Sequence, residues 1–436
     1  NNTLSNNTLN SNVRGIRLTS NSNYNTLINN TANSNTWHGF VLYSNSNYNT
    51  LINNTANSNS WYGIFFDSDT NNTLRNNSIQ SLHTPSSRQE GFLVYGTFFS
   101  HFKHDVDETN TINGLPILYA DGTSRQCPNN TIYTNGSSYS YMGFVGCFNI
   151  TIKDSSPTDH VLFAGTTNST LANLTISFTR IAIYLMTNSN YNTIFNNIIK
   201  MNSNYGIYID SSSNNNLFYY NNLICNTLNT YDEGNNIWDN GYPSGGNYWS
   251  DFDEPSEGAY DNNSDGIVDS PYYISGGSNV DRYPLMQPTI MPSVVYVDYD
   301  YNISTPGWQY DHFDKIQDGI DAVAADGTVY VFNGTYYENV VINKTINLIG
   351  EDGNGTIIDG GGSGDIFYIT ADWVNISEFT IRNSGIYGDD SGVKIHYANH
   401  NSIYSCNISN NGWSIRLYHS HNNLIYSCNI INNHCG

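Results

Sequence analysis

Basic residues are scarce in this chain. Its 436 residues include 15 Lys and Arg against 37 Asp and Glu, which gives a formal net charge of −22. Proteins that bind nucleic acids neutralise phosphates with Lys and Arg, so this composition excludes a nucleic-acid partner. Charged residues of both signs make up only 12% of the chain. The polar surface must therefore come from Asn, Ser, Thr and Tyr, which suits a secreted protein that meets neutral sugars.

Long apolar runs and cysteines are also few. No apolar run reaches 18 residues, which excludes a membrane-spanning helix within this segment. No signal peptide is recognisable, but both ends of the sequence lie inside repeats, so we expect a segment of a longer protein. Six cysteines are too few to be the main framework. Cys406 and Cys428 occupy equivalent repeat positions, where either a disulfide or a stack of thiols is open.

An exact repeat is the most informative feature present. Residues 21–35 and 45–59 both read NSNYNTLINNTANSN. A period of 24 residues is too short for the helix pairs of helical solenoids, and good helix formers are scarce. One turn of parallel strands per repeat remains, with coils about 4.8 Å apart. Leu27 then lies beside Leu51, and Phe40 beside Ile64. The sequence therefore predicts an all-β fold, a parallel β-helix with a continuous apolar core.

Asparagine pairs mark corresponding corners of the repeats. They recur at Asn29-Asn30, Asn53-Asn54, Asn76-Asn77 and Asn196-Asn197. Asn adopts the left-handed backbone region more readily than other non-glycine residues, and its side-chain amide can bond to the amides above and below it. We expect ladders of asparagine side chains at these corners.

The pattern changes along the chain. Regular repeats predict a first β-helix over 1–235, with an irregular excursion at about 81–140. A Gly- and Asp-rich connecting region follows over 236–292, and a second β-helix occupies 293–436. A short capping helix is expected over 311–323, with Asp311 as its N-cap. Its apolar face comprises Phe313, Ile316, Ile320 and Val323.

Several segments carry a family resemblance. Residues 247–251, 265–272 and 281–286 resemble the tail of NosD-like β-helix proteins, and residues 104–107 with 109–114 are similar to them too. Residues 297–336 resemble the opening of related surface β-helices. The resemblance covers most of the chain and implies a right-handed parallel β-helix repeat protein of the archaeal cell-surface type. The family is named for a periplasmic, copper-associated role.

The Gly- and Asp-rich region contains a calcium-loop-like motif. Its oxygen ligands would be Asp261, Asn263, Asp265, the carbonyl of Ile267, and Asp269. Gly266 stands at the position of the sharp turn, but position 12 is Tyr272 instead of Glu. A further ligand would have to come from Asp251, Asp253 or Glu257. The alternative is a hydrogen-bonded Asx turn, and either reading gives the loop a structural role.

Two groups of residues are candidate ligands for a transition metal. Residues 101–107 bring together two His and two Asp, and His419, His421, His434 and Cys435 form a second group. No Met or Cys accompanies the first group, and the chain has only 5 Met. Hydrogen-bonded coil edges are the preferred interpretation, so we do not expect copper.

Catalytic residues are hard to find. Asp389, Asp390 and His396 invite comparison with β-helical polysaccharide hydrolases, which use paired carboxylates. Asp is also common in turns such as this one, and a lyase would need clustered Arg or Lys. We expect a protein without catalytic activity.

Aromatic residues recur at the coil edges. Tyr24 and Tyr48, Trp37 and Trp61, and Tyr205 could stack on sugar faces, or could form ring ladders that stabilise neighbouring coils. The ladder interpretation is preferred, and the sugar-binding one stays open.

The sequence predicts an extracellular structural or adhesive protein of a cell-surface layer, sheath or fibre. Exposed strands at coil ends favour self-association, end to end or laterally, and cell-surface glycans are a second possible partner. Eighteen Asn-x-Ser/Thr sequons suggest N-glycosylation. The candidates are Asn29, Asn53, Asn129, Asn149, Asn173, Asn302, Asn343 and Asn407. The alternative function is a carbohydrate-binding or carbohydrate-active β-helix.

Overall fold

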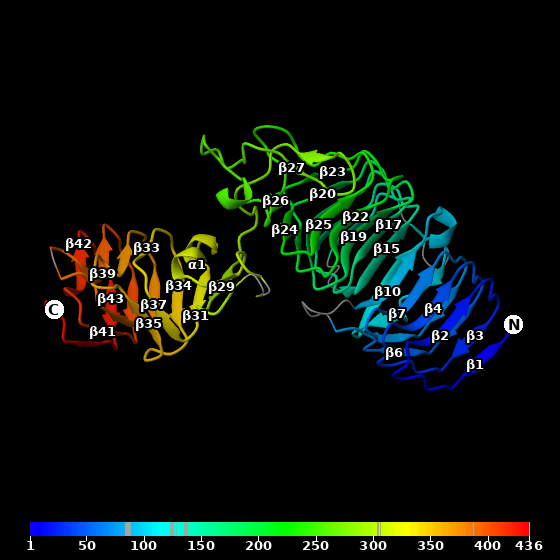
Figure 1. Cartoon of the computed structure of the whole chain (residues 1–436), viewed down its shortest axis with the longest axis horizontal. Helices are drawn as coiled ribbons and strands as arrows, with labels where there is room; N and C mark the ends of the chain where they lie inside the picture. Colours follow the sequence, from blue (N-terminus) through cyan, green and yellow to red (C-terminus); the bar gives the residue numbers. More distant parts are fainter. Residues whose placement is uncertain are drawn as a thin grey trace. The chain divides into compact units, whose positions relative to one another are not determined.

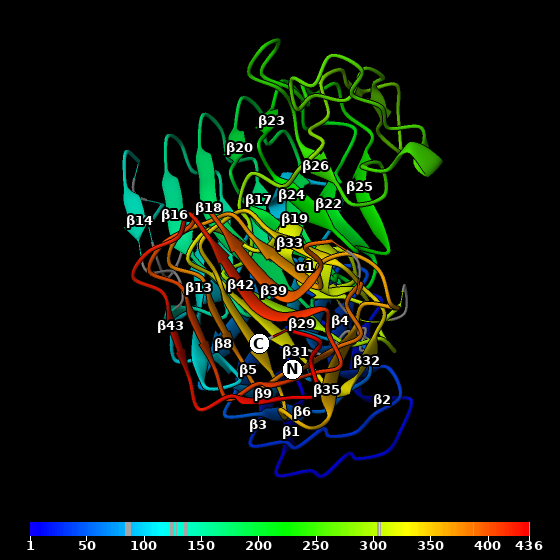
Figure 2. The same cartoon turned by 90° about the vertical axis from the view of Figure 1, so that its left-hand side faces the viewer.

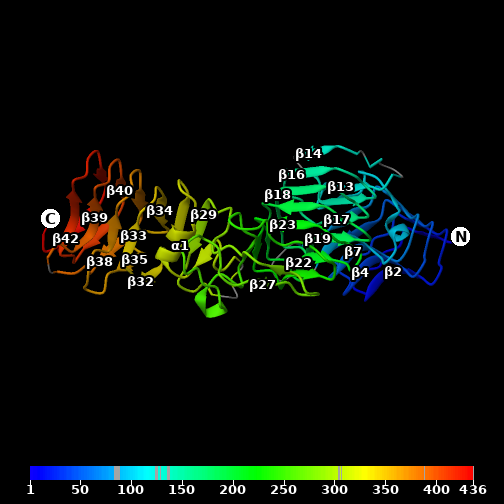
Figure 3. The ribbon, with the colours of Figure 1, turned by 90° about the horizontal axis from the view of Figure 1, so that it is seen from above.

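The chain folds as two compact units, Asn1–Ile290 and Met291–Gly436. The computed structural model describes residues 1–82, 89–122, 126–127, 129–134, 138–302, 305, 307–386 and 388–435. In each unit, short strands of successive coils lie side by side in parallel (Figure 1, Figure 3). The predicted parallel β-helix is confirmed.

The exact repeat sets the register of the coils. Leu27 pairs with Leu51, Phe40 pairs with Ile64, and all four side chains are buried. Near the end of the chain, Ile403 pairs with Ile425 in the same manner. Residues at equivalent repeat positions are therefore vertical neighbours, and their apolar side chains form the core.

The first unit contains four parallel or mixed sheets. The first comprises β1 (Thr3–Ser5), β3 (Thr26–Ile28), β5 (Thr50–Ile52), β8 (Thr73–Arg75) and β11 (Asp105–Val106), and the second comprises β2 (Arg14–Thr19), β4 (His38–Tyr43), β7 (Tyr62–Asp67) and β10 (Glu90–Tyr95). The third comprises β6 (Thr55–Asn57), β9 (Ser78–Gln80), β12 (Thr111–Ile112), β13 (Leu115–Ala120), β15 (Tyr141–Val145), β17 (Val161–Ala164), β19 (Ile181–Met186), β22 (Tyr205–Ile209) and β25 (Leu228–Asp232).

The fourth sheet runs along one side of the first unit (Figure 2). It comprises β14 (Ile132–Thr134), β16 (Thr151–Ser155), β18 (Thr170–Ser177), β20 (Thr193–Phe195), β21 (Ile198–Lys200), β23 (Leu217–Tyr219), β24 (Asn222–Ile224) and β26 (Tyr248–Trp249). A separate antiparallel pair is formed by β27 (Tyr272–Tyr273) and β28 (Val280–Asp281). Short 3-10 helices among the described residues include η1 (Phe99–Phe102) and η3 (Pro255–Glu257).

A hairpin reverses the strands in the middle of the first unit. Strand β12 runs parallel to β9 but antiparallel to β13. The turn between β12 and β13 is Asn113-Gly114, with φ of 51° and 84°, and Asn-Gly with two positive φ values is a favoured two-residue hairpin turn. Strands from β13 onward therefore run opposite to β6, β9 and β12 within one sheet. Strand β10 ends the second sheet at this point.

The predicted asparagine ladders are confirmed. Asn29 and Asn53 have φ of 55° and 53°, whereas Asn30 and Asn54, the next residues, are buried. Asn30 donates its side-chain N–H to Asn54 Oδ1 at 3.1 Å, and Asn54 donates likewise to Asn77 at 3.0 Å. The first asparagine of each pair turns the chain, and the second bonds to the coils on either side.

The Gly- and Asp-rich region closes the last coil of the first unit. Asn247 continues an asparagine ladder, since its Oδ1 accepts from Asn221 Nδ2 at 2.8 Å. Two buried indoles are held by carboxylates: Trp238 donates to Asp232 and Trp249 donates to Asp281, each at 2.9 Å. The region therefore packs as part of this unit.

The second unit has three parallel sheets. The first comprises β29 (Val294–Val297), β30 (His312–Phe313), β31 (Thr328–Val331), β34 (Asn347–Gly350), β37 (Asn375–Ser377), β40 (Ser402–Tyr404) and β43 (Leu424–Tyr426). The second comprises β32 (Gly334–Tyr336), β35 (Thr356–Asp359), β38 (Thr380–Arg382), β41 (Asn407–Ser409) and β44 (Asn429–Ile431). The third comprises β33 (Val340–Ile342), β36 (Phe367–Ile369), β39 (Ser391–His396) and β42 (Trp413–Tyr418).

The helix of the second unit is α1 (Ile316–Ala322). Its predicted apolar face is buried against the strands, but the predicted cap is wrong. Asp311 pairs with His312 at 2.8 Å, five residues before the helix begins. The carboxylate of Glu338 instead accepts the N–H groups of Ile316 and Gln317, at 2.8 and 3.0 Å. Among the described residues, no helix is long and apolar enough to cross a membrane.

Cysteines contribute one disulfide, between Cys127 and Cys147, with Cα atoms 5.2 Å apart. Cys406 and Cys428 are free thiols on neighbouring coils. Of the two arrangements left open by the sequence, the structure has the thiol stack.

Candidate ligand-binding site

Buried carboxylates join two sheets of the first unit where β10 has no further strand partner. Asp159 accepts the backbone N–H groups of Gly91 and Phe92 at 2.8 and 3.4 Å. Glu90 accepts the N–H of Ile181 at 3.0 Å. Asp159 also pairs with His160 at 2.7 Å, and both side chains are fully buried. We call this line of contacts the seam, because side chains here replace a strand-to-strand ladder.

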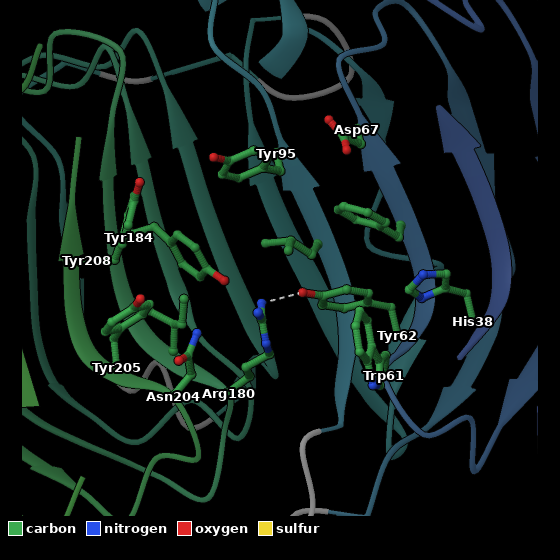
Figure 4. Close-up of a pocket in the computed structure, with 13 residues that line it drawn as sticks. His38, Trp61, Tyr62, Asp67, Tyr95, Arg180, Tyr184, Asn204, Tyr205 and Tyr208 are labelled. Carbon is green, nitrogen blue, oxygen red and sulfur yellow. Dashed lines mark hydrogen bonds between the residues drawn. The ribbon is translucent and has the colours of Figure 1, made fainter. Parts of the chain in front are cut away.

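A pocket of about 330 Å³ lies at the seam. One wall comes from residues on or next to β4, β7 and β10, and the other comes from β19, β22 and the residues before them (Figure 4). The seam pocket is lined by His38, Trp61, Tyr62, Phe65, Asp67, Leu93, Tyr95, Arg180, Ile181, Tyr184, Asn204, Tyr205 and Tyr208. Seven of these side chains carry a phenyl, phenol or indole ring, so the walls combine flat apolar faces with polar groups.

Two polar atoms in the pocket lack partners. His38 Nδ1 and the hydroxyl of Tyr184 are buried and have no hydrogen-bond partner among the described residues. The side chains of His38 and Tyr184 are 5% and 2% exposed. An unpaired buried polar atom costs about 1–3 kcal/mol. A polar ligand that bonded to either atom would remove its part of this cost.

The surroundings shift the pKa values of three side chains in the pocket. Burial, with the nearby Arg14, Arg17 and Arg180, lowers the pKa of His38 to about 4. Burial raises the pKa of Tyr62 and of Tyr184 well above the ordinary value of tyrosine. At neutral pH the imidazole is therefore uncharged and both phenols keep their protons.

The ring files predicted from the sequence are present. Tyr24 and Tyr48 stack with centroids 5.1 Å apart, and Trp37 and Trp61 stack at 5.3 Å. Arg14 covers Trp37 at 4.1 Å. In each pair, one face of each ring is covered by the ring of the neighbouring coil, as the ladder interpretation requires. Trp61 differs because it also lines the seam pocket.

The three candidate catalytic residues of the second unit make separate contacts. Asp389 pairs with Arg416 at 2.6 Å, and this arginine lowers the pKa of the carboxyl. His396 Nδ1 lies 2.9 Å from the hydroxyl of Tyr368, and its ring stacks on Tyr418. Asp390 turns back toward Gly385. No contact that brings the three to one substrate is seen.

The calcium-loop-like motif is closed by its own hydrogen bonds. Asp261 accepts the N–H groups of Asp265 and Gly266 at 3.1 and 2.8 Å, and Asp265 accepts that of Ile267 at 3.0 Å. Asp269 accepts from the backbone and side chain of Asn262. These contacts have the form of the Asx-turn alternative. Calcium at this loop stays a prediction.

Metal ligands do not converge among the described residues, since no group of three or more His, Cys, Asp or Glu is placed to hold an ion. In the candidate region 101–107, both ring nitrogens of His104 are engaged: Nδ1 accepts from Asn72 N–H at 3.3 Å, and Nε2 bonds to the carbonyl of His101 at 2.9 Å. Asp105 and Asp107 pair with Arg75. These side chains serve as hydrogen-bonded coil edges and do not fit a copper site.

Seven of the eight candidate glycosylation asparagines are exposed, namely Asn29, Asn53, Asn129, Asn149, Asn173, Asn302 and Asn343. Asn407 is half-buried, and its side-chain N–H groups donate to Gly353 and Asn354. A glycan on Asn407 would break these bonds. The side-chain amides of Asn149, Asn173 and Asn302 also donate hydrogen bonds, although these residues are exposed.

Sequence reasoning identified only Trp61 and Tyr205 of the pocket, as possible sugar contacts. His38, Tyr62, Arg180 and Tyr184 were missed. The sequence showed only a weak signal: after residues 35 and 59 the two copies differ at several positions, among them Thr36 and Ser60 as well as His38 and Tyr62.

Asp69 provides a test of burial near the pocket strands. It lies two residues beyond β7, has no exposed surface, and one of its carboxyl oxygens has no partner. Burial raises its pKa to about 7. The folded state therefore holds a proton that the unfolded state releases near pH 4, so the contribution of this carboxyl to stability is lost as the pH rises toward 7.

We expect Asp69→Asn, which mimics the protonated carboxyl, to remove this dependence. Between pH 5 and pH 8, the melting temperature of the unaltered chain should fall by roughly 5 °C relative to that of the variant. Differential scanning calorimetry of both proteins at the two pH values measures this. All other titratable groups are the same in the two proteins. If the difference between their melting temperatures is the same at pH 5 and at pH 8, Asp69 is already ionised in the folded protein at pH 5.

Comparison with known proteins gives one family. The sequence model of the family described as "Periplasmic copper-binding protein (NosD)" matches residues 1–99 and 94–254. No curated protein matches the chain. The PL6 family alginate lyase AlyGC is 10% identical, with 97% of this chain and 77% of that chain covered and a TM-score of 0.22. A variant of the periplasmic alginate epimerase AlgG is 10% identical, with 93% and 79% covered and a TM-score of 0.23. At these identities and TM-scores, neither bears on what this chain binds.

Proposed function

The chain belongs to the NosD family of parallel β-helix proteins, and from this premise we propose that it is a non-catalytic, extracytoplasmic β-helix that binds carbohydrate in the seam pocket. The observation that supports the proposal most is the pair of unpartnered polar atoms, His38 Nδ1 and Tyr184 Oη, in an aromatic-walled pocket. Sugar rings have apolar C–H faces and hydroxyl edges. The faces would pack on the aromatic side chains, and the hydroxyls would bond to the two atoms.

Binding of this kind fits an adhesive role. A stack of coils with asparagine ladders and a buried core is rigid, so it can hold a binding pocket at a fixed place on a cell surface or in a sheath. The structural and cell-surface parts of this role rest on the Asn-rich, anionic composition. Self-association is part of the proposal, and sedimentation at rising protein concentration tests it. Calcium in the loop at Asp261 is a further part, and a calorimetric titration with Ca²⁺ that shows no binding would remove it.

Trp61→Ala and Tyr184→Phe test carbohydrate binding. An array of polysaccharides identifies those that the unaltered chain binds, and affinity electrophoresis then compares the variants. We expect Trp61→Ala to lower the affinity at least tenfold, because a stacking platform is lost, and Tyr184→Phe to lower it several-fold, because one hydrogen bond is lost.

Trp373→Ala is the matched control. Trp373 is an exposed tryptophan of the second unit that stacks on His400 at 4.3 Å, so its removal should leave binding unchanged. Equal affinities for the unaltered chain and both pocket variants would place the carbohydrate elsewhere and refute the proposal.

A further inference from the structure

Arg180 lies in the middle of the seam pocket and has more N–H donors than its one side-chain hydrogen bond uses. Its side chain donates to the hydroxyl of Tyr62 at 2.5 Å (Figure 4). A guanidinium has five N–H donors, and among the described residues no other side chain is seen to accept from it. The pocket therefore contains a fixed cation whose remaining N–H groups are available to a ligand.

Positive charge is concentrated here although it is scarce in the chain. Of the 15 Lys and Arg in a chain of net charge −22, Arg14, Arg17 and Arg180 all lie close enough to His38 to depress its pKa. Arg14 and Arg17 are on β2, one coil away from His38 on β4. Arg180 lines the pocket itself, whereas Arg14 and Arg17 lie on the neighbouring strand outside its lining.

Carboxylates also lie at the pocket. Burial raises the pKa of Asp67, which lines the pocket, and that of Glu90, which accepts the N–H of Ile181. Asp159, on the far side of Glu90, is paired with His160 at 2.7 Å. Arg180 is the basic residue of the pocket lining, so an anion in the pocket would be drawn to its guanidinium.

On the basis of the proposed function, we infer that the ligand of the seam pocket is an acidic sugar, a hexuronic acid residue of a polysaccharide, whose carboxylate binds Arg180. The planar guanidinium matches the two oxygens of a carboxylate, and such charge-assisted bonds are stronger than those to neutral groups. The ring of the same sugar would lie on the aromatic wall, with its hydroxyls on His38 Nδ1 and Tyr184 Oη. The site thus differs from the neutral-sugar surface expected from composition.

A pair of matched ligands tests the inference without altering the fold. The probes are a hexuronate tetrasaccharide and the same tetrasaccharide with its carboxyl groups reduced to alcohols, titrated into the full chain by isothermal calorimetry. We expect the acid form to bind at least tenfold more tightly at low salt, and the advantage to shrink as salt is added, because salt screens the charge. In Arg180→Gln the two forms should bind alike, while in the control Arg282→Gln the preference should remain.

The outcomes separate this inference from the proposed function. Equal binding of the two probes by the unaltered chain overturns the acidic-sugar inference but leaves carbohydrate binding in place. Tighter binding of a sulfated tetrasaccharide than of the hexuronate also overturns it, because the preferred anion is then not a carboxylate. If no tetrasaccharide of any of the three kinds binds, the proposed function and the inference both fail.

Discussion

Replacing Asn54 by alanine should lower the free energy of unfolding by about 4 kcal/mol. Asn54 is buried and bonds to the coils on either side: its Oδ1 accepts from the backbone and side chain of Asn30 at 3.0 and 3.1 Å, and its Nδ2 donates to Leu27 O and Asn77 Oδ1, each at 3.0 Å. Alanine would leave several of these groups buried without partners. Denaturant unfolding followed by far-ultraviolet circular dichroism measures the loss.

The matched control is the neighbouring Asn53→Gly. Asn53 is exposed and has φ of 53°, a conformation that glycine adopts without strain, so its replacement should change stability by less than about 1 kcal/mol. Equal effects of the two variants would mean that the ladder contributes no more than the corner turn.

The second large effect is expected at the seam. Asp159→Ala should lower the free energy of unfolding by about 3–5 kcal/mol, the usual cost of removing one partner from a buried pair. The N–H groups of Gly91 and Phe92 at the edge of β10 would lose their acceptor, and His160 would lose its charge partner.

Asp300→Ala is the control for this prediction, since Asp300 is an exposed aspartate of the second unit. Hydrogen exchange adds a local readout: in Asp159→Ala the amides of Gly91 and Phe92 should exchange much faster, while the ladder amides of residues 50–52 should keep their protection. Unchanged stability and unchanged protection at Gly91 would show that Asp159 does not hold the seam together.

The coil architecture follows from the sequence because its cause is local and repeated. Identical segments can stack only in register, so Leu27 beside Leu51 is dictated by the 24-residue repeat itself. The corner ladders follow from the same repeat, because Asn30 and Asn54 occupy one position in successive copies. Neither conclusion needs contacts between unlike segments.

The pocket could not be predicted in this way, because it joins unlike segments. The Asn113-Gly114 turn reverses the strands and brings Arg180 and Tyr184 opposite Tyr62. Nothing in the repeat specifies that partnership. The predicted helix cap was wrong for a related reason. Asp311 is near the helix in sequence, but the carboxylate of Glu338, which is distant in sequence, accepts the first N–H groups of α1.

A crystal structure of the chain grown with a hexuronate tetrasaccharide tests the central claim most directly. The account predicts a sugar ring in the seam pocket, packed on Trp61, with oxygens within about 3 Å of His38 Nδ1 and Tyr184 Oη. A tetrasaccharide bound at another place, with only water in the seam pocket, would contradict it.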